Sequence, residues 1–108
     1  MVRVDRMELS KNIVRGFTAY DRLLERREDL RGQVEFLACC YPSRESVPAY
    51  ARYRDEVEAA AAHVNERWGT PGWQPVVLET QDDYPRSLAA LRRADVVVVN
   101  PVRDGLNL

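Results

Sequence analysis

The sequence has 108 residues, of which 45% are apolar and 31% charged, with a net charge of −1. This is the composition of an ordinary globular chain of at most one domain, and it argues against disordered, fibrous and polyanion-binding proteins, so nucleic acid is not an expected partner. The longest apolar run, at residues 96–99, is far shorter than the roughly 20 residues of a membrane helix, and the N-terminus has no signal pattern. We therefore expect the cytoplasm as the location.

The first third of the chain predicts a strand, a helix and a second strand. Residues 2–5 read as the tail of a strand, and Ser10 is placed to cap a helix that ends before Gly32. The helix carries an apolar stripe at three- and four-residue steps, made of Ile13, Phe17, Tyr20 and Leu24. Residues 34–40 form an almost continuous apolar run, which is typical of a strand covered on both faces in a parallel sheet.

A second helix is expected after this strand. Ser46 is placed to cap it, Pro48 suits its first turn, and Gly69 stops it. Its core-facing stripe consists of Tyr50, Tyr53, Val57, Ala61 and Val64. The opposite face is charged, so the pattern predicts a helix packed on one side only.

The last third predicts a third strand at residues 75–79, a helix opened by Asp83 and Pro85, and a fourth strand at residues 96–99. The order βαβαβαβ favours right-handed crossovers and an α/β fold with a doubly wound, Rossmann-like parallel sheet. Four strands are fewer than such a domain usually has, so we expect a partial sheet, cut at both ends, with another helix starting near Asp104.

Cationic residues lie in loops that follow the predicted strands, where ligands of open parallel sheets bind. Arg6 follows the first strand, and Lys11, the single lysine among 16 basic residues, precedes the first helix. Arg6 can grip phosphate oxygens with two parallel hydrogen bonds while Lys11 adds a compact charge beside helix amides, which suits a diphosphate. Two ordinary surface cations near a helix start are the alternative. The sequence contains no glycine-rich dinucleotide or ATP motif.

Other polar residues in these regions have a structural and a functional interpretation. Asp104 is either a helix cap or a carboxylate that accepts hydrogen bonds from sugar hydroxyls, and its spacing alone favours the cap. His63 has no partner near it in the sequence, which favours a surface histidine over a catalytic base. Trp68 and Trp73 flank the turn after the second helix and are expected to be packing residues.

Four spaced segments resemble one enzyme family. Residues 6–12 (RMELSKN) resemble the R-L-D-Y-[ST]-K-G segment of the trehalose-6-phosphate synthases, and residues 42–44 (PSR) resemble their P-S-R loop. Residues 64–70 (VNERWGT) are similar to I-N-x-[RK]-[FY]-G-T, and residues 100–108 (NPVRDGLNL) are similar to T-P-L-R-D-G-M-N-L. The four segments occur in the same order as in that family.

The resemblance implies the two-lobed GT-B architecture, with residues 1–108 as the first part of the C-terminal lobe, which binds the nucleotide sugar. It also implies transfer of glucose from UDP-glucose to glucose 6-phosphate with retention, in trehalose biosynthesis. Neither a cofactor nor a metal is implied. The N-terminal lobe of the same enzyme would then be the missing partner, because the active site of such an enzyme lies between two lobes.

Carried over position by position, the resemblance assigns roles to individual residues. Arg6 and Lys11 would bind the donor diphosphate, Asp104 would hold the donor glucose, and these three are the expected catalytic residues. Arg44 would bind the phosphate of glucose 6-phosphate, and backbone around Tyr84 would lie against the uracil. The other expected donor-binding residues, which would act through their amides, are Gly105, Leu106, Asn107 and Leu108.

The sequence also departs from the family pattern. Asn12 stands where the family usually has glycine, and Glu8 with Leu9 replaces Asp-Tyr. Because the resemblance extends to pseudo-glycosyltransferases that join cyclitols, a related enzyme with another acceptor is one alternative. A non-catalytic remnant that keeps the fold as an interaction module is the other.

Overall fold

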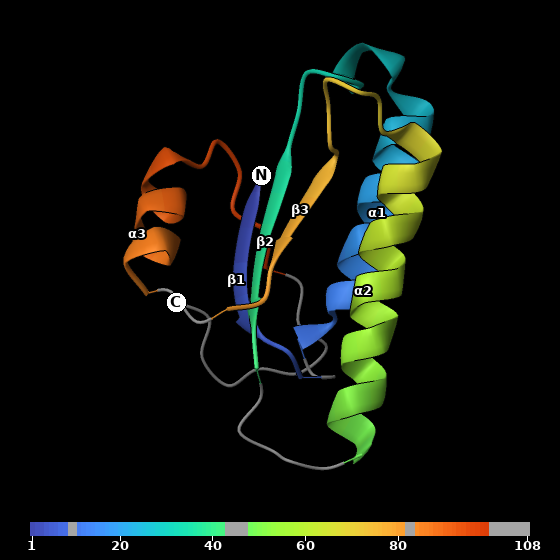
Figure 1. The fold of residues 1–108 in the computed structure, drawn as a ribbon. Helices are drawn as coiled ribbons and strands as arrows, with labels where there is room; N and C mark the ends of the chain where they lie inside the picture. Colours follow the sequence, from blue (N-terminus) through green and yellow to red (C-terminus); the bar gives the residue numbers. More distant parts are fainter. Residues whose placement is uncertain (9–10, 43–47, 82–83, 100–108) are drawn as a thin grey trace.

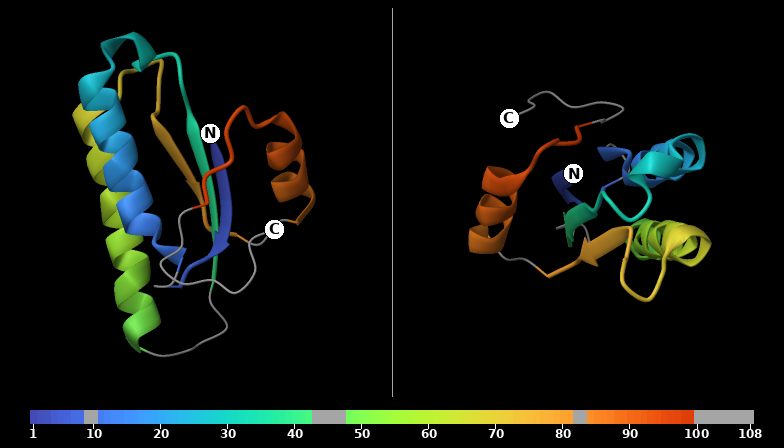
Figure 2. Two further views of the ribbon diagram at one scale, coloured as in Figure 1. Left: turned by 180° about the vertical axis from the view of Figure 1, so that it is seen from behind. Right: turned by 90° about the horizontal axis from the view of Figure 1, so that it is seen from above.

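The structure, a computed structural model, describes residues 1–8, 11–42, 48–81 and 84–99. Three parallel strands form its sheet in the order β1-β2-β3. These strands are β1 (Val2–Arg6), β2 (Phe36–Tyr41) and β3 (Val76–Glu79). Helices α1 (Ile13–Arg26) and α2 (Pro48–Trp68) cover one face of the sheet, and α3 (Tyr84–Arg93) lies on the other face (Figures 1 and 2). The predicted α/β class is confirmed.

The core lies between the sheet and the helix pair α1/α2. The predicted apolar stripe of α1 is fully buried, and Phe17 and Tyr20 each meet the ring of Phe36 edge-on, with centroids 5.5 and 5.2 Å apart. The predicted stripe of α2 is buried as well, apart from Tyr50, which is half-buried. Helical periodicity therefore identified the two faces that drive this layer together.

The start of α1 differs from the prediction, whereas the helix ends before Gly32 as expected. The residue that precedes the helix is Asn12 and not Ser10, which lies outside the described residues, and the Asn12 side chain makes no cap hydrogen bond. The helix ends at Arg26, and a short 3-10 turn, η2 (Glu28–Leu30), fills the connection before Gly32, whose φ is +78°. Serine is a frequent cap, but a left-handed residue two positions later starts this helix instead.

The prediction of a fourth strand at residues 96–99 is wrong in extent. Only one isolated parallel bridge forms, between Val97 and Val2, with Val2 donating to the Val96 carbonyl at 2.8 Å and Val98 to the Val2 carbonyl at 2.8 Å. Val96, Val97 and Val99 are 49–54% exposed, and among the described residues only Val98 of this run packs on the core. An apolar run forms a regular strand when both faces are covered, and here too few neighbours cover them.

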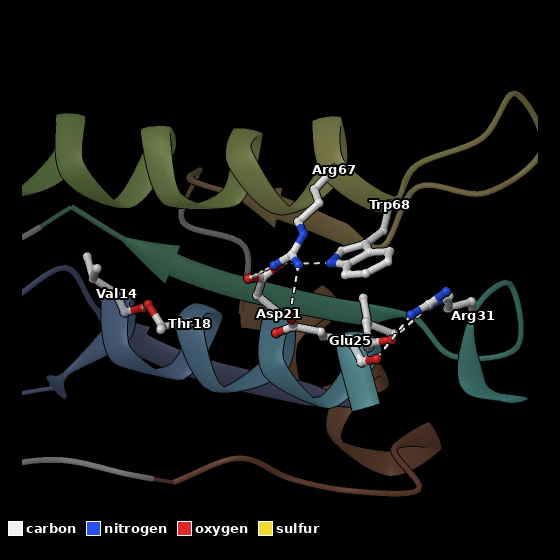
Figure 3. Close-up of polar contacts among 8 residues, drawn as sticks. Val14, Thr18, Asp21, Glu25, Arg31, Arg67 and Trp68 are labelled. Carbon is white, nitrogen blue, oxygen red and sulfur yellow. Dashed lines mark hydrogen bonds and ion pairs between the residues drawn. The ribbon is translucent and has the colours of Figure 1, made fainter. Parts of the chain in front are cut away.

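The two helices on one face are joined by a polar contact between the middle of α1 and the last two residues of α2 (Figure 3). Asp21 of α1 accepts hydrogen bonds from Arg67 at 2.8 Å and from the Trp68 indole at 2.7 Å, both on α2. The guanidinium groups of Arg31 and Arg67 lie over the Trp68 ring, 4.2 and 4.5 Å from its centroid. Trp68 is thus a packing residue, as predicted, with its polar nitrogen satisfied.

Candidate functional site

The order in which strands are added to the sheet reverses beside β1. Strands β2 and β3 succeed one another on one side of β1, whereas the chain after α3 returns to its other side, where Val97 pairs with Val2. The spatial order is therefore residues 96–99, β1, β2, β3. In an open α/β sheet, ligands bind beyond the carboxyl ends of the strands at such a switch point. The candidate site is accordingly the edge where β1 ends at Arg6, at the lower end of the sheet in Figure 1.

The loop that leaves β1 is held tightly against this edge. Met7 is buried, and its amide donates to the carbonyl of Tyr41 at the end of β2, at 2.7 Å. The amide of Glu8 donates to the carbonyl of Arg6 at 2.8 Å, and the amide of Lys11 to the carbonyl of Glu8 at 3.0 Å. These hydrogen bonds tie the backbone at Glu8 to both Arg6 and Lys11.

Asn12 adopts a left-handed backbone conformation, with φ 59° and ψ 39°. It is the one non-glycine residue with positive φ in the part of the chain that the structure describes. Glycine adopts this conformation without steric cost, and asparagine is among the few other residues that visit it routinely. The exchange of the family's glycine for Asn12 therefore keeps the backbone geometry of the loop.

The start of α1 has a partner of its own. The amide of Ile13 donates to the hydroxyl of Tyr53 on α2, at 2.9 Å, and both residues are buried. Burial raises the pKa of Tyr53, which keeps the hydroxyl neutral. The sequence suggested that amides at this helix start face a phosphate, and for Ile13 this is corrected, because its amide is already satisfied inside the protein.

Only part of the predicted site lies in the described structure. Arg6 is exposed, and within the described residues neither a hydrogen bond nor an ion pair holds its guanidinium, while Lys11 is half-buried. The backbone of Tyr84 begins α3. The remaining predicted site residues lie outside the described residues, namely Arg44, Asp104, Gly105, Leu106, Asn107 and Leu108. The binding roles of all these residues stay predictions.

A buried arginine beneath the loop was missed by sequence reasoning. Arg3, the second residue of β1, has a side chain only 1% exposed. Its Nε donates to Asp5 at 2.9 Å, and its Nη2 donates to the backbone carbonyl of Lys11 at 2.9 Å. The signal was present, since an arginine between Val2 and Val4 interrupts an apolar strand, and a buried charge needs a specific partner.

The second helix carries no sign of a catalytic base. His63 is exposed, as predicted, and borders a groove of about 340 Å³ on the outer surface of the α1/α2 pair, together with Phe17, Asp21 and Val64. Trp73 donates its indole hydrogen to the carbonyl of Val34 at 2.6 Å, which makes it a packing residue. The groove lies away from the carboxyl edge of the sheet, so it is a separate feature.

Two further classes of site were searched for in the same ranges of the chain. No group of three or more histidine, cysteine or acidic side chains is arranged to hold a metal ion within the described residues. Over those ranges, no helix combines the length and the apolar character needed to cross a membrane.

These features define a doubly wound α/β lobe of the kind found in GT-B glycosyltransferases. The chain belongs to glycosyltransferase family 20, whose family model matches residues 1–108. It is 36% identical over 106 residues to the trehalose-6-phosphate synthase of Salmonella arizonae, which covers 97% of this chain, and 36% identical over 110 residues to that of Sodalis glossinidius.

Solved structures of the same family share this fold. A UDP-forming α,α-trehalose-phosphate synthase from Burkholderia xenovorans, in complex with glucose-6-phosphate, superposes with a TM-score of 0.93 at 37% identity and covers 99% of this chain. An E. coli structure bound with UDP-2-fluoro glucose superposes with a TM-score of 0.92 at 33% identity. The chain spans only 22–24% of the length of these relatives.

Proposed function

We propose that this chain supplies part of the donor-binding half of a retaining glycosyltransferase that moves glucose from UDP-glucose to glucose 6-phosphate. The products are trehalose 6-phosphate and UDP, and the reaction belongs in the cytoplasm, where both phosphorylated substrates are made. Residues 1–108 are then the first part of the C-terminal lobe of a longer enzyme. The observation that carries the proposal is the position of Arg6 and Lys11 beyond the end of β1, at the switch point of a family 20 fold.

The two cations of this loop suit a diphosphate leaving group. An exposed guanidinium at the end of β1 can bind two phosphate oxygens with parallel hydrogen bonds. The ammonium of Lys11 contributes a compact charge two residues before the first residue of α1. The positive end of the helix dipole adds to both. We therefore assign Arg6 and Lys11 to the donor diphosphate.

The reaction needs charge stabilisation on the leaving group. The bond between the glucose anomeric carbon and the diphosphate oxygen breaks, and a bond to the anomeric oxygen of glucose 6-phosphate forms on the same face of the sugar. The acceptor proton passes to the departing phosphate. Because negative charge grows on that phosphate in the transition state, Arg6 and Lys11 stabilise the transition state more than the bound substrate.

The remaining roles rest on residues outside the described ranges and on the family resemblance. We assign Arg44 to the phosphate of glucose 6-phosphate and Asp104 to the donor glucose. The backbone near Tyr84 is assigned to the uracil. The amides assigned to the donor sugar and diphosphate belong to Gly105, Leu106, Asn107 and Leu108. The N-terminal lobe of the longer enzyme completes the cleft.

The direct experiment is an end-point assay of the full-length protein that carries this chain. UDP-glucose and glucose 6-phosphate are supplied together, and the sugar product is examined by NMR for an α,α-linkage. Formation of trehalose 6-phosphate with release of UDP is expected. Turnover only with a cyclitol phosphate as acceptor would replace the proposal with the related transferase, and UDP-glucose binding without turnover on any acceptor would indicate a remnant.

A further inference from the structure

The buried guanidinium of Arg3 connects the sheet to the loop that carries Lys11. Parallel register places Arg3 opposite Ala38 and Asp5 opposite Cys40, and both Ala38 and Cys40 belong to the core under α1 and α2. Because side chains alternate along a strand, Arg3 and Asp5 share that covered face of β1. The cation is therefore enclosed between the sheet and the start of α1.

The hydrogen bonds of Arg3 run along this enclosed space. Asp5, whose side chain is 20% exposed, accepts from Nε at 2.9 Å, and the carbonyl of Lys11 accepts from Nη2 at 2.9 Å. The second terminal nitrogen, Nη1, is buried without a hydrogen-bond partner among the described residues. Neighbouring contacts continue this support, since Tyr53 holds the Ile13 amide two residues after Lys11.

An arginine in this position is a poor choice for stability alone. Removing a charge from water is costly even when it is paired, and an unsatisfied buried donor adds to the cost, so a buried ion pair is often no more stable than apolar side chains in place of both partners. Sites where stability is given up are frequently functional sites. Arg3 binds the backbone of Lys11, in the loop of the proposed diphosphate site.

We propose that Arg3 is a positioning residue, which fixes the backbone at Lys11 so that the lysine ammonium is held at the donor diphosphate. This inference rests on the proposed function of Lys11. Arg3 does not touch the substrate in this account. It acts by removing freedom from the Lys11 carbonyl, and misplacing a charged group by about an ångström is enough to reduce catalysis about a hundredfold.

The test is a double-mutant cycle in the full-length enzyme with Arg3→Met and Lys11→Ala. Arg3→Met removes the charge and both donors at similar volume. We expect kcat/KM for UDP-glucose to fall about 10- to 100-fold, the size of one lost hydrogen bond to a charged group, with KM for glucose 6-phosphate and the apparent melting temperature nearly unchanged. In the Lys11→Ala background, Arg3→Met should have little further effect, because its effect passes through Lys11.

A conservative variant and a control variant are measured beside the double-mutant cycle. Arg3→Lys keeps a buried cation with a single donor nitrogen and should recover part of the donor kcat/KM. The matched control is Arg27→Met. Arg27 also pairs with an aspartate two residues on, Asp29, at 2.8 and 2.9 Å, but both are exposed and follow the end of α1 far from the loop. This control should leave donor kinetics unchanged.

Equal losses from Arg3→Met in both backgrounds would overturn the positioning role while leaving Lys11 as a donor ligand. If Lys11→Ala alone leaves donor kinetics unchanged, the proposed function of the loop fails and the role of Arg3 fails with it. Should Arg3→Met not fold, Arg3→Lys takes its place in the same cycle. Loss of folding in both variants would also overturn the proposal, because Arg3 would then serve the fold alone.

Discussion

Asn12 shows how one residue can replace glycine without changing the loop around it. Its backbone lies in the left-handed region, with φ 59°. We predict that Asn12→Gly folds with nearly unchanged stability, because glycine enters this region freely. Asn12→Val should lower the free energy of unfolding by about 1–2 kcal/mol, since a branched side chain clashes there. Urea unfolding of both variants provides the measurement, and an Asn12→Val variant as stable as Asn12→Gly would contradict the left-handed geometry.

Cys40 gives the fold a predictable dependence on alkaline pH. Burial, opposed in part by the charge of Arg3, raises the pKa of its thiol from 9.0 to about 12. The unfolded chain loses this proton above its ordinary value while the folded chain keeps it. Stability is therefore full below pH 9 and declines as the pH rises from 9 towards 12, by up to about 1.4 kcal/mol per pH unit.

The variant Cys40→Ala isolates this contribution. The stability lost between pH 8 and pH 10.5 should be smaller in the variant by about 2 kcal/mol. The cost of the smaller side chain is present at both pH values and cancels in the difference. Tyr20, whose pKa burial raises to about 12, remains in both proteins and accounts for part of the residual slope. Equal losses in the two proteins would show that the Cys40 thiol is not protected.

Some residues of the candidate site could be predicted from the sequence and others could not. Arg6 and Lys11 could be singled out because ligands of a parallel sheet bind where strands end, and strand ends are readable from apolar runs. Arg3 could have been singled out as a cation that interrupts an apolar strand, but its partners could not be predicted until the register and the covering helices were known. The hydrogen bond from the Ile13 amide to the hydroxyl of Tyr53, 40 residues further on, is likewise a tertiary contact that no local sequence pattern predicts.

Asp21 is the most buried carboxylate at the junction between α1 and α2, where Glu25 also pairs with Arg67 at 3.2 Å. Asp21 has a side chain only 14% exposed and accepts from the Trp68 indole at 2.7 Å (Figure 3). We predict that Asp21→Ala lowers the free energy of unfolding by about 1.5–3 kcal/mol, the magnitude for a hydrogen bond to a charged group. The matched control is Asp29→Ala, which breaks an exposed ion pair and should have a much smaller effect. If both variants lower the free energy of unfolding equally, the hydrogen bonds of Asp21 stabilise the fold no more than an exposed ion pair does.

The helices were easier to predict from their apolar patterns than the last strand was. The stripes of α1 and α2 have a clear helical period, and both helices form with those stripes inside. The run at residues 96–99 has the composition of a buried strand, yet it forms only the bridge at Val97. Its composition shows that the segment favours an extended, covered state, but composition cannot say whether covering elements are present.

The chain as a whole spans about a quarter of the length of its relatives. This limits the activity that we expect of the chain alone. Catalysis requires the donor and the acceptor in one orientation, and in the proposed enzyme a second lobe provides half of the cleft. We predict that the isolated 108-residue chain forms no trehalose 6-phosphate from UDP-glucose and glucose 6-phosphate in a coupled UDP-release assay. Turnover close to that of the full-length protein would show that these residues form a complete active site.

The placement of the donor and acceptor phosphates is tested most directly by steady-state kinetics of the full-length enzyme with each substrate varied in turn. Lys11→Ala, and equally Arg6→Ala, should lower kcat/KM for UDP-glucose by about one to three orders of magnitude, because the charge lost acts on the leaving group in the transition state. Arg44→Ala should chiefly raise KM for glucose 6-phosphate, because that phosphate is remote from the reacting carbon. Unchanged donor kinetics in Lys11→Ala, together with crippled donor binding in Arg44→Ala, would contradict the account.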